Sequence, residues 1–159
     1  MKIRIICVGK IKEAFYREAV NEYTKRLSKF SSVEIVELPD EKTPDNASEK
    51  ENLNIIEKEG MSILKSIKPG EYVISLCIEG KKLNSTGFAD KLSDIMVQGS
   101  NTIDFIIGGS LGLSEKVKNI SDFKLSFSDM TFPHQLMRVI LTEQIYRSFK
   151  IINNEPYHK

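Results

Sequence analysis

The stretch Phe105-Ile-Ile-Gly-Gly-Ser-Leu-Gly112 is an apolar run that ends in a glycine-rich turn. Further along, Ser126-Phe-Ser-Asp-Met-Thr-Phe-Pro-His134 is a Ser/Thr-containing loop that leads into a long apolar segment. Glycines let other groups approach the backbone closely, so a strand, a glycine turn and a polar loop together suit a pocket for a small ligand. Because α/β sheets bind ligands at the carboxyl ends of their strands, the two stretches predict a backbone-lined pocket at that edge of a sheet.

Around these stretches, strand and helix patterns alternate along the whole chain. Short β-branched runs predict strands, and apolar residues spaced three and four apart predict amphipathic helices. The expected strands are residues 2–8, 33–38, 72–78, 102–107 and 124–127, and the expected helices are residues 12–30, 48–67, 85–96, 114–119 and 133–152. The alternation predicts an α/β fold with a mostly parallel sheet and helices on both faces. No internal repeat or linker is visible, so we expect a single domain, residues 1–159.

Three local signals set boundaries within this pattern. Ser48 and Glu51 form a capping box, which opens the second helix. Residues 79–82, Glu-Gly-Lys-Lys, are expected to form a turn after the third strand. Pro133 suits the first position of the last helix, because the N–H group that it lacks would have no partner there.

Composition limits the class of protein. At 159 residues the chain can bury roughly 70% of its unfolded surface, and 28% charged with 40% apolar residues is ordinary for a globular protein. No apolar run approaches the ~20 residues of a membrane span, and the start lacks a signal-peptide cleavage site. Cys7 and Cys77 lie in apolar runs, which favours buried, reduced thiols and a cytosolic protein. The net charge of +1 argues against a basic surface all round, although cations gather in the first thirty residues.

The last expected helix is apolar on more than one side. One stripe runs through Met137, Leu141, Ile145, Phe149 and Ile152, and further apolar positions extend it round the helix. A helix of this kind is buried on more than one side. It either lies deep in its own fold or packs against a second copy of the chain, and we favour a homodimer. His134, Arg138 and Thr142 form its polar row.

Several common α/β chemistries are disfavoured by their motifs. The turn at residues 108–112 has the wrong spacing for a dinucleotide fingerprint, and Gly80-Lys81 lacks the remainder of a Walker motif. Two histidines and two scattered cysteines do not make a zinc site, and no nucleophile elbow is present. On pattern alone, the glycine turn is either a tight strand-to-helix connection or a ligand cradle.

Three segments together resemble one known family. They are Ile107-Gly-Gly-Ser-Leu-Gly112, the run from Leu125 to Arg147, and the ending Pro156-Tyr-His-Lys159. Their residues are similar to those of the ribosomal RNA large subunit methyltransferase H family (RlmH), a minimal member of the SPOUT class. The resemblance covers the whole chain, and no motif position departs from the family pattern.

The resemblance implies a fold and an activity that the residue pattern alone does not indicate. It implies a C-terminal trefoil knot, an exception to the rule against threaded connections, and a homodimer. It implies S-adenosylmethionine as methyl donor, no metal, and a substrate pseudouridine in 23S ribosomal RNA that is methylated at N3 on the assembled ribosome. The positions that correspond to the donor pocket are Leu76, Gly108, Gly109, Phe127, Ser128, Asp129, Met130, Thr131 and Phe132.

The dense polar ending supplies the candidates for the chemical step. Methyl transfer requires removal of a proton from the imide nitrogen, and histidine titrates near neutral pH. We therefore assign His158 to proton handling or orientation and Tyr157 to stacking on or bonding to the target base; the alternative for His158 is a solvated terminal residue. Arg138 and Lys159 are candidates for phosphate binding or ordinary surface cations, and His134 suits either helix capping or catalysis.

Two other classes of function stay open at this point. A module that binds ribosomes without chemistry would not need Gly108-Gly109 or the loop around Thr131. A different nucleotide-using enzyme would need a phosphate cradle, which the sequence does not show. Methyl incorporation from labelled donor into intact ribosomes, compared with protein-free RNA, separates all three.

Overall fold

The computed structural model describes residues 1–159 and contains one sheet of five parallel strands. The strands are β1 (Lys2–Val8), β2 (Ser32–Leu38), β3 (Tyr72–Lys82), β4 (Thr102–Ile107) and β5 (Phe123–Ser126). Their order across the sheet is β2-β1-β4-β3-β5, with every neighbouring pair parallel. The predicted α/β class and parallel sheet are therefore confirmed.

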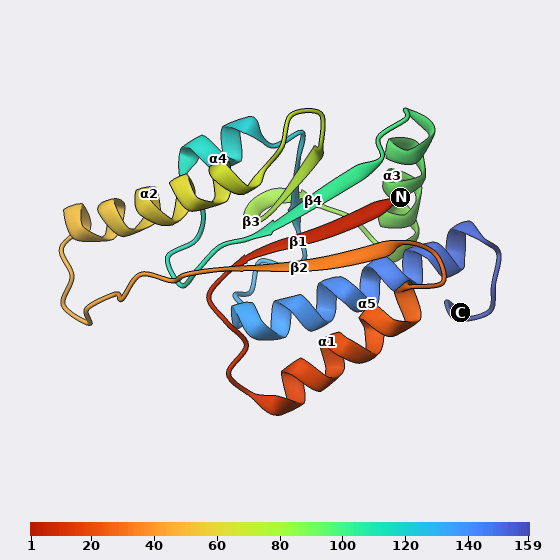
Figure 1. Ribbon diagram of the computed structural model, residues 1–159, viewed down its shortest axis with the longest axis horizontal. Coiled ribbons are helices and arrows are strands. Elements are labelled where there is room, and N and C mark those ends of the chain that lie inside the picture. Colours follow the sequence, from red (N-terminus) through yellow and green to blue (C-terminus); the bar gives the residue numbers. More distant parts are fainter.

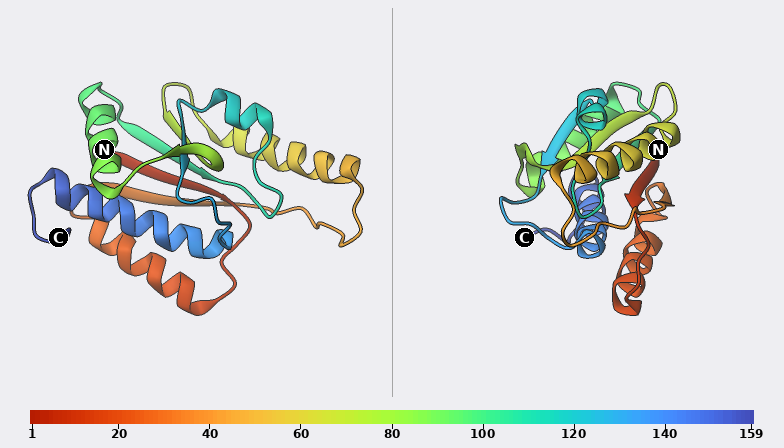
Figure 2. Two further views of the ribbon diagram at one scale, coloured as in Figure 1. Left: turned by 180° about the vertical axis from the view of Figure 1, so that it is seen from behind. Right: turned by 90° about the vertical axis from the view of Figure 1, so that its left-hand side faces the viewer.

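Helices cover both faces of this sheet (Figure 1). They are α1 (Ala14–Leu27), α2 (Glu49–Ser66), α3 (Ser85–Val97), α4 (Glu115–Ile120) and α5 (His134–Ile152). The two views of Figure 2 place α2 and α4 on one side of the strands and α1 with α5 on the other. None of the helices has the length and apolarity needed to cross a bilayer.

Two hydrophobic clusters, one on each face, hold the layers together. On β1, Ile3, Ile5 and Cys7 face the cluster under α1, α3 and α5, whereas Ile6 and Val8 face the cluster under α2 and α4. This alternation is the period of two expected of a strand that is buried on both faces. Burial also raises the pKa of the Cys7 thiol to about 12, so it stays protonated.

The third strand is longer than its sequence pattern predicts. Residues 79–82, expected to form a turn, continue β3 to Lys82. The register against β5 shifts between Leu76 and Lys81, so the extra residues are accommodated in an irregular, bulged pairing. A Cβ on Gly80 would lie 2.7 Å from the backbone of Leu125, which shows how closely the two strands approach there.

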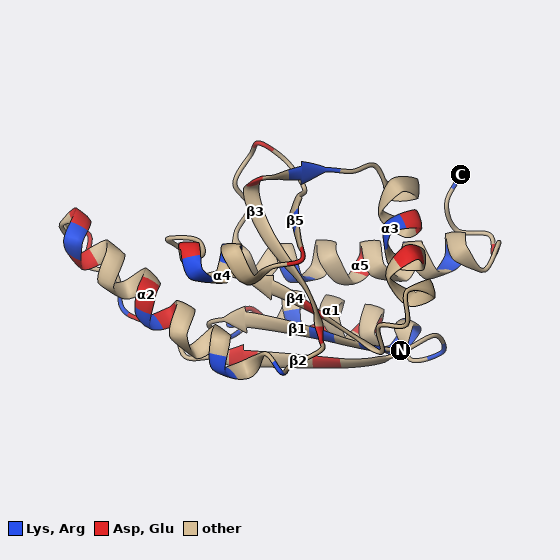
Figure 3. Cartoon of the chain, turned by 90° about the horizontal axis from the view of Figure 1, so that it is seen from above, with Lys and Arg blue, Asp and Glu red and all other residues tan.

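The helix boundaries follow their capping residues. The Ser48 side chain accepts a hydrogen bond from the N–H group of Glu51, and the Glu51 side chain accepts one from the N–H group of Ser48, so the predicted capping box is confirmed. Asn84, not Ser85, caps α3, because its side-chain oxygen accepts from the N–H group of Gly87 at 2.8 Å. Charged residues are spread along α2, while most of α5 is uncharged (Figure 3).

A buried ion-pair cluster lies between β1 and β4, near the amino ends of these strands. Arg4 donates to Glu71 at 2.7 Å and to Asp104 at 3.1 Å, and Asp104 is fully buried. Burial, together with the neighbouring Glu71, raises the pKa of Asp104 to about 7. The cluster joins the start of the sheet to the segment that follows α2.

Candidate functional site

The candidate site is a cavity of about 390 Å³ at the carboxyl ends of β3, β4 and β5. We call it the glycine-turn cavity. It is lined by Leu76, Cys77, Ile78, Glu79, Ile107, Gly108, Gly109, Ser110, Leu111, Gly112, Leu113, Lys118, Leu125, Ser126, Phe127, Ser128, Met130, Thr131, Phe132, His134 and Met137. Its position is the one that the two opening stretches of sequence predict.

The glycine turn closes tightly on itself. Its Gly112 N–H group donates to the Gly109 carbonyl at 3.1 Å, and Gly112 has a φ of +85°, which favours glycine. A Cβ on Gly108 would lie 2.9 Å from the backbone carbonyl of Gly112, closer than real Cβ atoms come. The turn can therefore keep this shape only with glycine at 108, and backbone atoms form that part of the wall.

A buried carboxylate supports the turn from behind. Glu59 on α2 is 5% exposed, and a Cβ on Gly109 would lie 2.8 Å from its Oε2 atom. Its other oxygen accepts the N–H group of Glu41 at 3.1 Å. Burial raises the pKa of Glu59 and the hydrogen bond from the Glu41 N–H group opposes this rise, while the charges of Asp40 and Glu41 add to it. Sequence reasoning missed Glu59, because on the helix pattern it is one more glutamate of a charged helix.

The residues assigned to the donor pocket by resemblance gather at this cavity with one exception. Leu76, Gly108, Gly109, Phe127, Ser128, Met130, Thr131 and Phe132 line it. The exception is Asp129, whose side chain is largely exposed and forms an ion pair with Lys82. Its neighbours are held by the loop itself, since Ser128 accepts the N–H group of Met130 at 3.0 Å.

The charges in the wall of the cavity neutralise one another. Lys118 contacts Glu79 at 2.7 Å and Glu115 at 2.6 Å. The hydrogen bond to Lys118 lowers the pKa of Glu79, and those to Glu115 and Glu79 raise the pKa of Lys118. Burial raises the pKa of Cys77, so its thiol is protonated at neutral pH. The cavity thus offers backbone, hydroxyl and apolar groups but no free cation for a phosphate.

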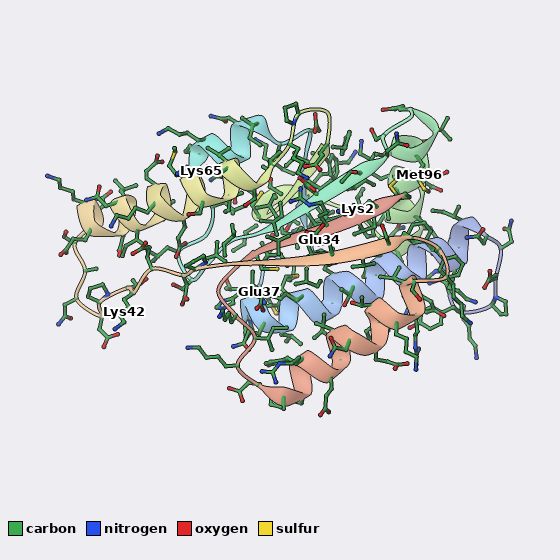
Figure 4. All side chains as sticks on the ribbon, in the orientation of Figure 1. Lys2, Glu34, Glu37, Lys42, Lys65 and Met96 are labelled. Carbon is green, nitrogen blue, oxygen red and sulfur yellow. The ribbon has the colours of Figure 1, made fainter.

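Arg138 corrects a prediction made from the sequence. Expected as a phosphate-binding or ordinary surface cation, it is fully buried. Its guanidinium donates to Glu37 at 2.8 Å and to the carbonyls of Val8 and Gly9 at 3.3 and 2.7 Å. Glu37 is labelled on β2 in Figure 4, where that strand passes the start of α5. Arg138 therefore joins α5 to the carboxyl ends of β1 and β2.

His134 occupies the first position of α5 and borders the cavity. Its ring is half-buried, and the point where a Cβ of Gly9 would lie is 3.7 Å from its Nε2 atom. Burial, followed by the charge of Arg138, lowers its pKa, although Asp40 acts in the opposite direction. Its side chain does not cap the helix, so the capping role considered from the sequence is wrong.

The C-terminal tail, residues 154–159, folds back onto α5. The Tyr157 hydroxyl donates to Glu143 at 3.1 Å, and its ring packs against Tyr146 with the ring centres 4.9 Å apart. Arg147 lies over the Tyr157 ring at 4.7 Å and contacts His158 Nδ1 at 3.4 Å. Burial, with hydrogen bonds from neighbouring groups, raises the pKa of Tyr157, so the hydroxyl keeps its proton.

Within one chain, the tail and the cavity lie at opposite ends of α5. The cavity includes His134 at the start of this 19-residue helix, and the tail follows its last turn. At 1.5 Å per residue the helix is about 28 Å long, and Figure 1 shows the C-terminus at the end remote from the start of α5. The structure therefore does not bring Tyr157 or His158 to the cavity of the same protomer.

The chain matches a known protein family along nearly its whole length. The family model described as predicted SPOUT methyltransferase matches residues 1–158. The chain belongs to the SPOUT methyltransferase family. A protein of Methanococcus maripaludis is 58% identical over the full length of both chains. Proteins named ribosomal RNA large subunit methyltransferase H from Clostridium botulinum and Clostridium perfringens are 57% and 55% identical, again over full length.

A solved structure supports the fold alone. A methylase family protein from Haemophilus influenzae Rd KW20 superposes with a TM-score of 0.55 at 11% identity, covering 99% of this chain and 70% of the other. SPOUT methyltransferases, including RlmH proteins, use S-adenosylmethionine as methyl donor. The glycine-turn cavity fits this ligand, because close backbone approach at Gly108 and a wall without free cations suit an adenosine that carries no phosphate.

Proposed function

We propose that this protein transfers a methyl group from S-adenosylmethionine to N3 of a pseudouridine in 23S ribosomal RNA, and that it does so on the assembled ribosome. The relatives named as ribosomal RNA large subunit methyltransferases, which match along their whole length, support the class of substrate. The cavity itself carries the proposal. The segments that the resemblance assigns to the donor pocket are far apart in sequence, and all of them contribute residues to the lining of this one cavity.

The donor is held by the backbone and apolar wall of the glycine-turn cavity. Leu76, Gly108 and Gly109 line the cavity together with the residues of the loop 127–132 other than Asp129, which forms an ion pair with Lys82. The bound donor supplies an activated methyl group. The protein's own contribution is to hold donor and base in line and to exclude water, which accounts for much of the rate in reactions of this type.

The complete active site needs two copies of the chain. Because tail and cavity lie at opposite ends of α5, a second protomer packed with its α5 antiparallel to the first would carry its tail to the first cavity. In such a homodimer Tyr157 contacts the target base and His158 orients it. The tail is held ready by its contacts with Glu143 and Arg147 of α5.

The two remaining cations have different roles in this arrangement. Arg138 is a positioning residue that fixes the start of α5 against β1 and β2, since its guanidinium is used by internal partners. Lys159 is exposed and makes no ion pair within the chain, so it is free to contact an RNA phosphate.

We also propose the remaining properties that the resemblance implies. The chain acts in the cytoplasm as one domain, residues 1–159, and its C-terminal part forms a trefoil knot. The packing of α5 against both α1 and α3, and the pairing of β5 with β3, support a compact C-terminal half. Tracing the chain in an experimental electron-density map tests the knot: an unthreaded path through residues 108–133 would exclude it.

Labelled methyl incorporation tests the proposed function directly. Intact 70S ribosomes, isolated large subunits and protein-free 23S RNA are incubated with the enzyme and radiolabelled S-adenosylmethionine. We expect incorporation into intact ribosomes, at N3 of a pseudouridine identified by mass spectrometry of digested RNA, and much less into protein-free RNA. A module that only binds ribosomes would give binding without label, and label on another nucleotide would refute the assigned target.

A further inference from the structure

The cavity has a histidine of its own. His134 is the only histidine in the cavity wall, since His158 follows the far end of the same helix. Removal of the N3 proton needs a base within hydrogen-bonding reach of the target. A residue fixed at the first turn of a helix meets that need more directly than one on a terminal segment, because its backbone is held by the fold.

A carboxylate shares the surroundings of this ring. The point where a Cβ of Gly9 would lie is 3.7 Å from His134 Nε2 and 3.8 Å from Asp40 Cγ. Gly9 has a φ of +86° and no side chain, so the imidazole and the carboxylate face the same gap. Gly9 follows β1, Asp40 follows β2, and His134 is the first residue of α5. Three elements therefore converge at this gap.

The charges around the ring favour its neutral form. Burial and the cations Arg138 and Lys12 lower the pKa of His134, and only Asp40 raises it. The positive end of the α5 macrodipole adds to the same effect. Elsewhere in the cavity wall, Glu79 and Lys118 neutralise each other. A neutral imidazole at working pH is what a general base requires.

We propose that His134, which faces the same gap beside Gly9 as the Asp40 carboxylate, is the general base of the methyl transfer, an assignment that rests on the proposed function. The N3–H bond of the pseudouridine breaks and its proton passes to a ring nitrogen of His134. The freed electron pair on N3 forms the bond to the methyl carbon, and the electrons of the carbon–sulfur bond stay on sulfur. The imidazolium then returns its proton to water. The tail of the second copy orients the target nucleobase.

The first experiment measures the ring without reference to activity. With only two histidines in the chain, NMR titration of the ring protons resolves both, and His158→Gln assigns them. We expect His134 to titrate below its ordinary value, and Asp40→Asn to move the midpoint lower still because a negative neighbour is removed. Asp45→Asn is the matched control in the same exposed loop, and no shift is expected there. An unchanged midpoint in Asp40→Asn would overturn the pairing.

The second experiment measures single-turnover methylation of ribosomes as a function of pH. We expect His134→Gln to lower the rate by about 10²–10⁴-fold while donor affinity by calorimetry stays close to that of the wild type. Its rate should rise with pH without levelling, because the base is lost and only free N3 anions react, whereas the wild-type rate levels above the pKa of His134. A merely structural role would change affinity and leave the shape of the pH profile unaltered, which would refute the assignment.

Asp40→Asn keeps this test decisive if His134→Gln fails to fold. Asp40 is exposed on a loop, so its amide variant leaves the core untouched. We expect its pH–rate profile to level at a lower pH than that of the wild type, with the Asp45→Asn profile unchanged. A wild type that transfers no methyl group to ribosomes would refute the proposed function itself, whereas full activity with an unaltered profile in both His134→Gln and Asp40→Asn would refute only the role of His134.

Discussion

At the scale of single residues, the geometry at Gly108 gives a sharp test of the cavity. An alanine Cβ there would meet the Gly112 carbonyl at 2.9 Å, so the turn has to open. We expect Gly108→Ala to fold but to bind S-adenosylmethionine at least about tenfold more weakly, a difference of about 1.4 kcal/mol. Calorimetry gives the affinity. The stabilisation by saturating donor, about 2.7 kcal/mol at ~100 times Kd, should shrink with it.

Gly70→Ala is the matched control for this variant. Gly70 also has a positive φ, of +84°, but nothing lies within 4 Å of its Cβ position and it belongs to an exposed turn remote from the cavity. A loss of about 1 kcal/mol of stability is expected from the strained backbone, with donor affinity unaffected. Equal donor affinity in Gly108→Ala and the wild type, or binding of ATP by the wild type as strong as that of the donor, would show that the cavity is not the donor site.

The buried pair of Arg4 and Asp104 predicts a pH dependence of stability. The pKa of Asp104 rises from 3.8 to about 7 on folding, mainly through burial and then through Glu71. The native state therefore holds the extra proton between these values, and the free energy of unfolding falls as pH rises from about 4 to about 7. In urea titrations, Asp104→Asn should lose this decline. The same decline in wild type and variant would assign it to another group.

Residue patterns predicted backbone features better than side-chain burial. The capping box at Ser48 and Glu51 could be predicted because both partners lie within one helical turn. The burial of Arg138 could not be predicted, because its partners are more than a hundred residues away in sequence. They are Glu37 and the carbonyls of Val8 and Gly9. A polar row on a helix indicates an exposed face only where no such distant partner exists.

At the scale of elements, β3 and α5 show where periodicity misleads. The polar residues that end β3 look like a turn, but pairing with β5 across a bulge keeps them extended. On α5, the apolar stripe predicted to mark a dimer interface is largely internal: Leu141, Ile145 and Phe149 are buried against the sheet, α1 and α3. The apolar residues of α5 that are partly exposed and not packed against either hydrophobic cluster are Leu136, Val139, Ile140 and Ile151.

This burial changes which substitution tests the homodimer. Ile145→Asp puts a charge into the core and should unfold the protein, which says nothing about the interface. Val139→Asp changes a partly exposed position of α5. We expect it to give a folded monomer that still binds the donor but methylates ribosomes very poorly. Light scattering gives the mass, and circular dichroism checks the fold. A wild-type dimer in Val139→Asp would move the interface away from this face.

At the scale of the whole molecule, the relation between cavity and tail could not be predicted from sequence alone. The donor segments and the ending Tyr157-His158-Lys159 are close in sequence, which suggests proximity in space. A rigid 19-residue helix separates them by about 28 Å instead. The cavity could be predicted because its parts follow neighbouring parallel strands, whereas a site shared between two copies depends on an assembly that one chain does not contain.

Mixing two impaired variants distinguishes a shared site from one within a single chain, provided that the donor is kept well below the wild-type Kd. Under that condition the cavity of Gly108→Ala is mostly empty although its tail is intact, and deletion of residues 157–159 removes the tail but keeps the cavity. The deletion also removes the contacts of Tyr157 with Tyr146 and Glu143, so the stability and donor binding of the deletion variant are measured first.

After subunit exchange, roughly half of the dimers are mixed, and each mixed dimer holds one intact cavity facing one intact tail. If the tail acts on the partner's cavity, the mixture should recover about a quarter of wild-type methylation. If each tail serves its own chain, no mixed dimer contains a complete site, and the activity of the mixture stays at the sum of the two variants.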